Sequence, residues 1–280
     1  MTTARFVSCS LSPAETGRST DAPSLTGFGP TLLGLSLVLP MYNERGNVDR
    51  TLTAAIDTLG STVSDYEIIV VDDGSTDGSA ELVEQWCRRE PRVRLLRHAR
   101  NEGYGAALRS GFVAARKSLV MYTDLDLPCD LRVISQALAL LDDADVVIGY
   151  RCTYGGSRWR RLQSRLYNQL IRWLFGLYVR DVGFSCKLFR SEALRCYPIG
   201  SQTGLIAAEV LINAQRGGYR VVELPVQYQP RLFGTSKMGS LRVTWGILRE
   251  MAMLGWMRRS SKGGQWRGAR RIPQALSDRA

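Results

Sequence analysis

Between residues 34 and 151 the chain alternates short apolar runs with segments of helical periodicity. Five runs are nearly continuous in Val, Leu and Ile: "LGLSLVLP", "YEIIVV", "RVRLL", "SLVMY" and "ADVVIG". Such strands are typical of a parallel sheet that helices cover on both faces. The sequence therefore predicts an α/β fold with a mostly parallel, Rossmann-like sheet. The first strand is expected to stop at Pro40, with a helix from about 47 to 59.

Polar side chains follow these strands at the points where the strands end. In a parallel sheet ligands bind at the carboxyl ends of the strands, so side chains that follow different strands meet at one edge. We therefore expect a binding site at this edge, built from Asn43, Glu44, Asp72, Asp73, Asn101, Asp124 and Asp126.

The stretch "VMYTDLDLPCD" places two carboxylates one residue apart, at Asp124 and Asp126. In an extended chain both would point to the same side, where they repel unless a positive group lies between them. Two hard oxygen ligands suit Mg²⁺ or Mn²⁺, which complete their coordination with water and phosphates. The plainer alternative is a pair of surface acids in a loop after a strand.

Two further acids, Asp72 and Asp73, follow a buried strand in "VVDDGSTDGS". Helix capping and Asx-type turns account for part of this stretch. Capping and turns do not use both carboxylates. The remaining one could accept hydrogen bonds from a base N–H or from ribose hydroxyls. The glycines at 103 and 105 do not fit the GxGxxG dinucleotide pattern; they suit a tight turn or a helix start near an anion.

Composition restricts the chemistry that the chain can perform. One histidine, His98, makes a His-rich metal site impossible, and six scattered cysteines suit reduced thiols better than zinc or disulfides. The chemistry of the chain must therefore rely on carboxylates and cationic side chains. The net charge is +11, with seven arginines and no acid from 151 to 180. This excess favours phosphates or a lipid surface as partners, and no nucleic-acid-binding motif accompanies it.

The two ends of the chain are expected to lie outside the folded domain. Residues 1–33 form a Ser/Thr/Pro/Gly-rich leader without the apolar core of a signal peptide, and residues 260–280 a basic tail; both are expected to be disordered. Residues 241–257 are apolar-rich but too polar to span a bilayer. They could dock on the core, or lie in a membrane interface with Trp245 and Trp256 as anchors.

The motifs "PMYNE", "VVDDGSTDGS", "NEGYGAA", "DLD", "GYR", "R..SR..N", "E.PV" and "R..GTSK" occur in this order. Together they resemble the family 2 glycosyltransferases of GT-A fold, most closely the polyprenyl- or dolichyl-phosphate mannosyl- and glucosyltransferases. The resemblance covers roughly residues 35–240. It implies a GT-A domain over 34–240, with a nucleotide-sugar half at 34–150, an acceptor half at 151–240 and an amphipathic helix at 241–259.

The resemblance also implies roles for individual residues. The residues implied to bind the nucleotide are Pro40, Tyr42, Glu44, Asp72, Asp73, Asn101 and Gly103. The two acids Asp124 and Asp126 match those that hold a divalent cation on the sugar diphosphate, and Arg151 matches the arginine that closes the "GxR" strand. The residues implied near the acceptor and donor phosphates are Arg161, Ser164, Arg165 and Asn168. The loop implied to close over the diphosphate carries Arg231, Ser236 and Lys237.

The chain departs from the pattern of the lipid-phosphate enzymes in one motif. They often carry a polar residue, usually Gln, after the second acid of the DxD motif, whereas this chain has Leu127 followed by Pro128. Two acids keep the family's places without an assigned role: Asp181, and Glu209, which could equally be a core carboxylate paired with an arginine.

The resemblance implies an inverting, metal-dependent glycosyltransferase, peripheral on the cytoplasmic face of the membrane. Its donor would be a UDP- or GDP-hexose, its cofactor Mg²⁺ or Mn²⁺, and its acceptor a polyprenyl phosphate. An acceptor phosphate is already ionised and needs no strong general base, which agrees with a chain that has one histidine.

Three alternatives stay open from the sequence. A family 2 transferase could use the hydroxyl of a sugar, a cell-wall glycan or a natural product as acceptor. A nucleotidyltransferase would carry a Gly/Arg/Lys-rich phosphate loop after the first strand, where this chain has "PMYNE". A non-catalytic, membrane-recruited binding module would not need both acids of "DLD". The sugar, the base, the lipid and the oligomeric state are not determined.

Overall fold

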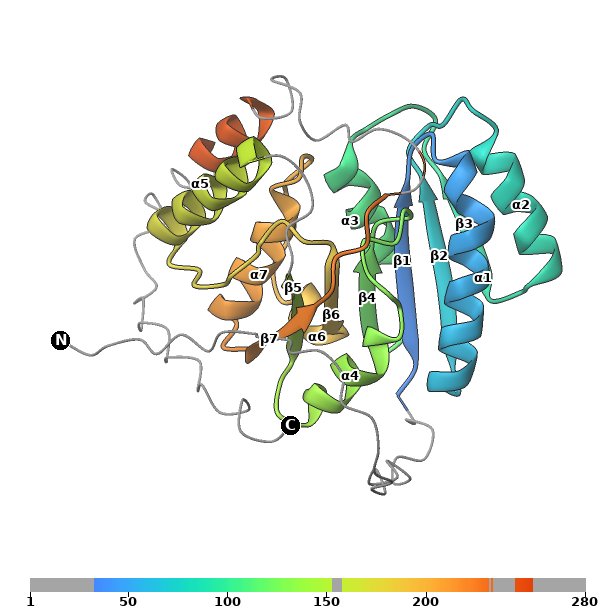
Figure 1. The fold of residues 1–280 in the computed structure, drawn as a ribbon, viewed down its shortest axis with the longest axis horizontal. Coiled ribbons are helices and arrows are strands. Elements are labelled where there is room, and N and C mark those ends of the chain that lie inside the picture. The colour runs from blue at the N-terminus through green and yellow to red at the C-terminus, as the bar shows by residue number, and fades with distance from the viewer. Residues whose placement is uncertain (1–32, 153–157, 232, 234–244, 254–280) are drawn as a thin grey trace, which may run out of the picture.

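A computed structural model describes residues 33–152, 158–231, 233 and 245–253. One seven-stranded sheet runs through the described chain in the order β3-β2-β1-β4-β6-β5-β7 (Figure 1). The strands are β1 (Leu35–Met41), β2 (Tyr66–Asp72), β3 (Val93–Arg97), β4 (Leu119–Thr123), β5 (Val146–Arg151), β6 (Cys186–Arg190) and β7 (Val221–Val226). Only β6 runs antiparallel to its neighbours, β4 and β5. The mostly parallel sheet predicted from the apolar runs is confirmed.

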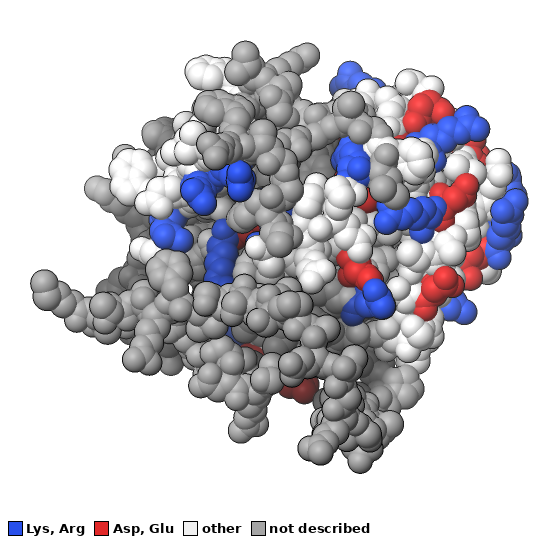
Figure 2. All heavy atoms as spheres, in the orientation of Figure 1, with Lys and Arg blue, Asp and Glu red and all other residues white. Residues whose placement is uncertain are grey.

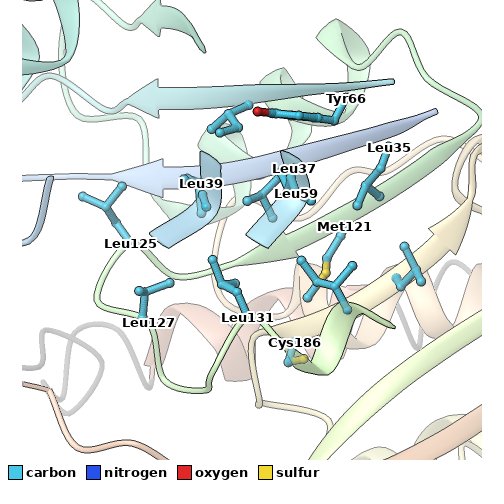
Figure 3. Packing of buried hydrophobic residues seen from close by; sticks show 14 of the residues in the cluster. Leu35, Leu37, Leu39, Leu59, Tyr66, Met121, Leu125, Leu127, Leu131 and Cys186 are labelled. Carbon is cyan, nitrogen blue, oxygen red and sulfur yellow. The ribbon is translucent and has the colours of Figure 1, made fainter. Parts of the chain in front are cut away.

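Helices cover both faces of this sheet, because alternate strand residues point to opposite sides. On one face Leu35, Leu37 and Leu39 pack against α1 (Arg45–Thr62), α2 (Ser79–Arg89) and α4 (Val133–Ala139) in a single apolar cluster (Figure 3). The intervening Val38 faces the second cluster. That cluster contains residues of α3 (Tyr104–Ala114), α5 (Arg158–Phe175), α6 (Ser191–Arg195) and α7 (Ile206–Arg216). A short 3-10 turn, η1 (Leu140–Asp142), precedes β5.

The expectation that Pro40 ends the first strand is wrong by one residue, since β1 continues through Pro40 to Met41. Pairing with β4 ends at Val38, whereas pairing with β2 continues to Met41. Met41 turns its carbonyl oxygen toward the β2 side, where it accepts a hydrogen bond from the Asp73 N–H. The adjacent Pro40 therefore faces the unpaired side, where a missing N–H removes no ladder bond.

The second half of the chain completes the same sheet. The proposed boundary at residue 150 falls within β5, and β5, β6 and β7 extend the sheet beyond β4. The predicted arginine-rich helix is α5, and the predicted helix around Glu209 is α7.

The described part of the predicted C-terminal amphipathic helix covers 245–253 and docks on the core. Met251 is buried in the second cluster, and the Glu250 carboxylate accepts hydrogen bonds from the backbone amides of Gln202 and Thr203. Among the helices of the described ranges, none has both the length and the apolar character needed to cross a bilayer. The expected leader and basic tail lie outside the described residues.

Candidate active site

The "DLD" stretch forms a turn directly after β4. The Leu127 N–H donates to the Asp124 carbonyl oxygen at 3.1 Å, so the chain here is not extended as the i, i+2 argument assumed. The intervening leucines fix the turn, because Leu125 and Leu127 are 1% and 5% exposed and pack into the first apolar cluster (Figure 3). Leu127 adopts φ 51°, an unfavourable conformation for a leucine that its burial offsets. The Leu127 side chain, at the place where a polar residue would be expected by resemblance to the lipid-phosphate enzymes, therefore belongs to the core.

Burial and hydroxyl groups define the environment of Asp124. The Tyr104 hydroxyl at the start of α3 donates to the Asp124 Oδ1 at 2.8 Å, and the Ser185 hydroxyl also hydrogen-bonds this carboxylate. Burial, reinforced by the neighbouring Asp126 charge, raises the pKa of Asp124 to about 6, although Ser185, Tyr104 and Arg231 act in the opposite direction. A cation that binds this carboxylate would stabilise its ionised form, which burial and the Asp126 charge disfavour.

A guanidinium lies between the acids of the site. The Arg231 Nε donates to the Asp126 Oδ2 at 2.6 Å, and its Nη1 donates to the Glu44 Oε1 at 3.2 Å. Arg231 follows β7, so the ion pair joins the "R..GTSK" segment to "PMYNE" and "DLD". The positive group that the paired carboxylates require is here supplied by the protein itself.

The same acids suit a divalent cation. Among the described residues, the buried Asp126 Oδ1 finds no hydrogen-bond partner, which is an unfavourable state for a carboxylate oxygen. Within the described ranges no group of three or more His, Cys, Asp or Glu side chains gathers as a metal cage. Two carboxylates with one vacant oxygen fit Mg²⁺ or Mn²⁺, which take most of their ligands from water and phosphate.

Two strand-end loops are tied together beside these acids. The Asn43 N–H donates to the Ser75 Oγ at 2.9 Å, and its side-chain Oδ1 accepts from the Thr76 N–H at 2.8 Å. The Glu44 N–H donates to the Ser79 Oγ at 3.1 Å. These bonds hold "PMYNE", with Pro40 and Tyr42, against "DDGSTDGS", so Glu44 keeps a fixed place at the edge of the sheet.

The carboxylates of Asp72 and Asp73 are both buried and both shape loops. Asp73 accepts from the backbone amides of Glu102 and Gly103 at 2.8 and 2.9 Å, and from the His98 ring at 2.8 Å. Asp72 accepts from the Ser75 N–H at 3.0 Å. Asp73 thus holds the loop that carries Asn101, which is exposed. Contact between any of these residues and a nucleotide stays a prediction.

Glycine is required at two places in these loops. Gly103 adopts φ 102° and Gly74 φ 74°, a region that L side chains rarely enter. A Cβ on Gly74 would also lie 2.6 Å from the Arg100 backbone carbon. Gly74 therefore permits close approach of the two loops, and Gly103 permits the turn that begins α3.

Comparison with known proteins identifies the fold and motifs. Residues 36–198 match the model of glycosyl transferase family 2. The chain belongs to this family. It is 29% identical over 79% of its length to glycosyltransferase AglD of Haloferax volcanii, and 31% identical over 76% to the undecaprenyl-phosphate 4-deoxy-4-formamido-L-arabinose transferase of Edwardsiella ictaluri. The chain covers 37% and 65% of the lengths of these relatives.

A solved structure of the same fold contains the ligands expected for the family. The mannosyltransferase PcManGT from Pyrobaculum calidifontis, in complex with GDP-Man and Mn²⁺, superposes with a TM-score of 0.57 at 21% identity. The alignment covers 82% of this chain and 65% of that one. The GT-A fold expected from the motifs is confirmed.

The "GYR" arginine of the family is part of a buried ion pair in this chain. Arg151 donates from Nε and Nη2 to the two oxygens of Asp181 at 2.6 and 3.0 Å, and Asp181 is fully buried. The Asn168 side chain on α5 donates to the Arg180 carbonyl oxygen and accepts from the Val182 N–H. Both residues therefore hold the 180–185 segment, which leads to Ser185 and Asp124.

Lys187 also holds this segment. The sequence motifs did not indicate a role for Lys187, Tyr104 or Ser185. The Lys187 ammonium group donates to the carbonyl oxygens of Val182 and Phe184. Complete burial lowers the pKa of Lys187 to about 8. A lysine inside the otherwise apolar strand "CKLF" was the available signal, because a buried lysine requires polar partners.

The remaining predicted residues of the family motifs are placed as follows. Arg161 and Arg165 are exposed on α5, and Ser164 is half-buried between them. Ser236 and Lys237 lie outside the described residues. Glu209 is buried on α7 and accepts from the backbone amides of Gly200 and Ser201, so the partners it finds in the described chain are not arginines.

Proposed function

We propose that this chain is an inverting, metal-dependent glycosyltransferase that moves a hexose from a UDP- or GDP-sugar to a polyprenyl phosphate. The observation that carries the proposal is the cluster of Asp124, Asp126, Glu44 and Arg231 at the carboxyl edge of the sheet, where one buried oxygen of Asp126 has no partner within the described part of the chain. This cluster carries motifs of glycosyl transferase family 2, and one relative of this chain is by its name an undecaprenyl-phosphate transferase.

Asp124 and Asp126 would hold the divalent cation, which when bound supplies charge neutralisation at the sugar diphosphate. Arg231 and Lys237 would donate hydrogen bonds to the leaving phosphate, where negative charge develops. The nucleotide would be bound along the two tied loops by Pro40, Tyr42, Glu44, Asp72, Asp73, Asn101 and Gly103.

The acceptor would lie between the "DLD" turn and α5. Arg161, Ser164 and Arg165 would bind its phosphate, and Asn168 would hold the adjacent 180–185 segment in place. The phosphate arrives ionised and attacks the sugar carbon directly, so the anomeric configuration inverts. A hydroxyl acceptor would require a positioned carboxylate base instead. Glu209 is already engaged with two backbone amides, which favours the phosphate acceptor. Since such an acceptor is anchored in a bilayer, we place the enzyme at the cytoplasmic face of the membrane.

Calorimetry with UDP, GDP and TDP, each with Mn²⁺ or with EDTA, tests the donor site. One nucleotide should bind with Mn²⁺ and not with EDTA, and Asp126→Ala should abolish this binding. Asp130→Ala is the matched control, because Asp130 lies on the same loop but pairs with Arg132 away from the cluster. Transfer from the matching sugar nucleotide to polyprenyl phosphate then tests the acceptor. The absence of metal-dependent binding of any nucleotide would overturn the transferase assignment.

A further inference from the structure

Large apolar side chains are concentrated in two places on the described surface. One is α5 with the turn that follows it, and the other is the helix at 245–253. The exposed residues there are Leu162, Leu166, Trp173, Leu174, Tyr178, Trp245, Leu248 and Met253. Trp173 and Trp245 are 76% and 72% exposed. Contiguous exposed apolar residues of this size mark an interaction surface more often than isolated ones do.

The apolar residues of α5 form a stripe along its outer side. Leu162, Leu166 and Trp173 are spaced by four and seven residues, so they lie on one helical face. Ile171 and Phe175, on the other side, are buried in the second apolar cluster. The outer stripe therefore takes no part in packing α5 on the sheet.

The helix at 245–253 likewise has one buried side and one exposed apolar side. Its inner side carries Met251, which is 2% exposed, and Glu250, whose carboxylate accepts from the Thr203 hydroxyl at 2.6 Å. With these residues turned inward, Trp245, Leu248 and Met253 are left on the outer side. Both helices contribute buried residues to the second cluster, so they lie on the same side of the sheet (Figure 1).

The charge around these apolar residues is positive. Arg161, Arg165 and Arg172 are exposed on α5, which contains no acidic residue, and Arg249 is exposed on the second helix. The acid of the second helix, Glu250, is turned inward. In Figure 2 blue side chains gather over the position of α5. This mixture of tryptophan, aliphatic and arginine side chains is the pattern of helices that lie in a membrane interface.

We propose that the outer faces of α5 and 245–253 together form a docking face for an anionic lipid bilayer. The apolar side chains enter the interface while the arginines bind lipid headgroups, and the molecule lies on the membrane without crossing it. A second copy of the chain fits this face less well, since a symmetric contact would bring arginines against arginines. The inference deepens the proposed function, because it names the surface that meets the acceptor's bilayer, but it does not depend on the sugar-transfer chemistry.

Vesicle flotation tests the proposal on the full chain. The protein should float with vesicles that contain phosphatidylglycerol and remain unbound with phosphatidylcholine alone. The double variant Trp173→Ser/Trp245→Ser should lower partitioning by about tenfold or more, because each indole loses its place in the interface. Arg172→Gln/Arg249→Gln should lower it by roughly fivefold per arginine. The matched control Arg88→Gln/Arg89→Gln, on the exposed side of α2, should bind like the wild type.

Quenching of tryptophan fluorescence by brominated lipids gives an independent readout of insertion. The wild type should be quenched in anionic vesicles, and the double tryptophan variant should lose most of this effect. Failure of the wild type to bind anionic vesicles, or equal binding by the tryptophan variant, would overturn the proposal. A dimer in sedimentation velocity that Trp173→Ser dissociates would assign the face to a second copy. Donor calorimetry on the same variants separates these outcomes from a failure of the transferase site.

Discussion

At the scale of single residues, the site is a balance of charges at one edge of the sheet. Asp124, Asp126 and Glu44 would repel one another, and the Arg231 guanidinium that touches two of them offsets this repulsion. A divalent cation would supply the same neutralisation with more charge at a shorter distance. Arg231 and the cation would therefore compete for Asp126 until a diphosphate gives the arginine another anionic partner.

This competition predicts an unusual effect of Arg231→Gln. Without nucleotide, the variant should bind Mn²⁺ about tenfold more tightly than the wild type, because the carboxylates lose their resident cation. With the sugar nucleotide present, turnover should fall, because a donor to the leaving phosphate is lost. Electron paramagnetic resonance of free Mn²⁺ measures the first effect.

Arg97→Gln is the control for this measurement. Arg97 lies 3.5 Å from the buried Asp72 carboxylate, outside the acid cluster. Its removal should leave Mn²⁺ affinity unchanged. Unchanged or weaker Mn²⁺ binding by Arg231→Gln would contradict the competition.

At the scale of secondary-structure elements, one buried carboxylate joins several parts of the sheet away from the site. Glu67 on β2 accepts from the Ser36 hydroxyl of β1 at 2.8 Å, from Arg94 of β3 at 2.5 Å and from the Arg116 N–H at 2.7 Å. Burial alone would raise the pKa of Glu67, but these hydrogen bonds and the Arg94 charge lower it below 4.5. Three elements thus depend on the ionised form.

Glu67→Gln should lower the free energy of unfolding by about 1–3 kcal/mol at neutral pH, because hydrogen bonds to a charged group are lost. Since the folded-state pKa is lowered, this stabilisation is present above the ordinary pKa and is lost as the pH falls through the folded-state value. Urea denaturation of both proteins should therefore show curves that converge in acid. Glu102→Gln, at an exposed position, should leave stability unchanged at both pH values. A difference that persists in acid would contradict this account.

At the scale of the whole molecule, one sheet connects the strand-end loops of the first half of the chain to the second half. Asp124 lies at the junction, since Tyr104 reaches it from the first half and Ser185 from the second. Ligands that bind this junction hold both halves in the folded state. Binding should therefore stabilise the whole fold rather than one loop.

Thermal unfolding tests this expectation. In saturating Mn²⁺, the preferred nucleotide at about a hundredfold above its Kd should raise the free energy of unfolding by about 2.7 kcal/mol, and the Tm by about 5–10 °C, relative to Mn²⁺ alone. The shift should appear as one cooperative transition and vanish in Asp126→Ala. An equal shift in that variant would place the nucleotide elsewhere.

The sequence by itself determined the parallel strands, the helices between them and the residues at their carboxyl ends, because apolar periodicity and strand-end polarity are local patterns. It did not predict the antiparallel strand β6. The family motifs added the GT-A fold. Neither indicated that Arg231 lies against Asp126 and Glu44, which are 105 and 187 residues away along the chain. Nor did they show which face of 245–253 turns inward. Such pairings depend on which distant segments the sheet order brings together, and only the tertiary structure decides that.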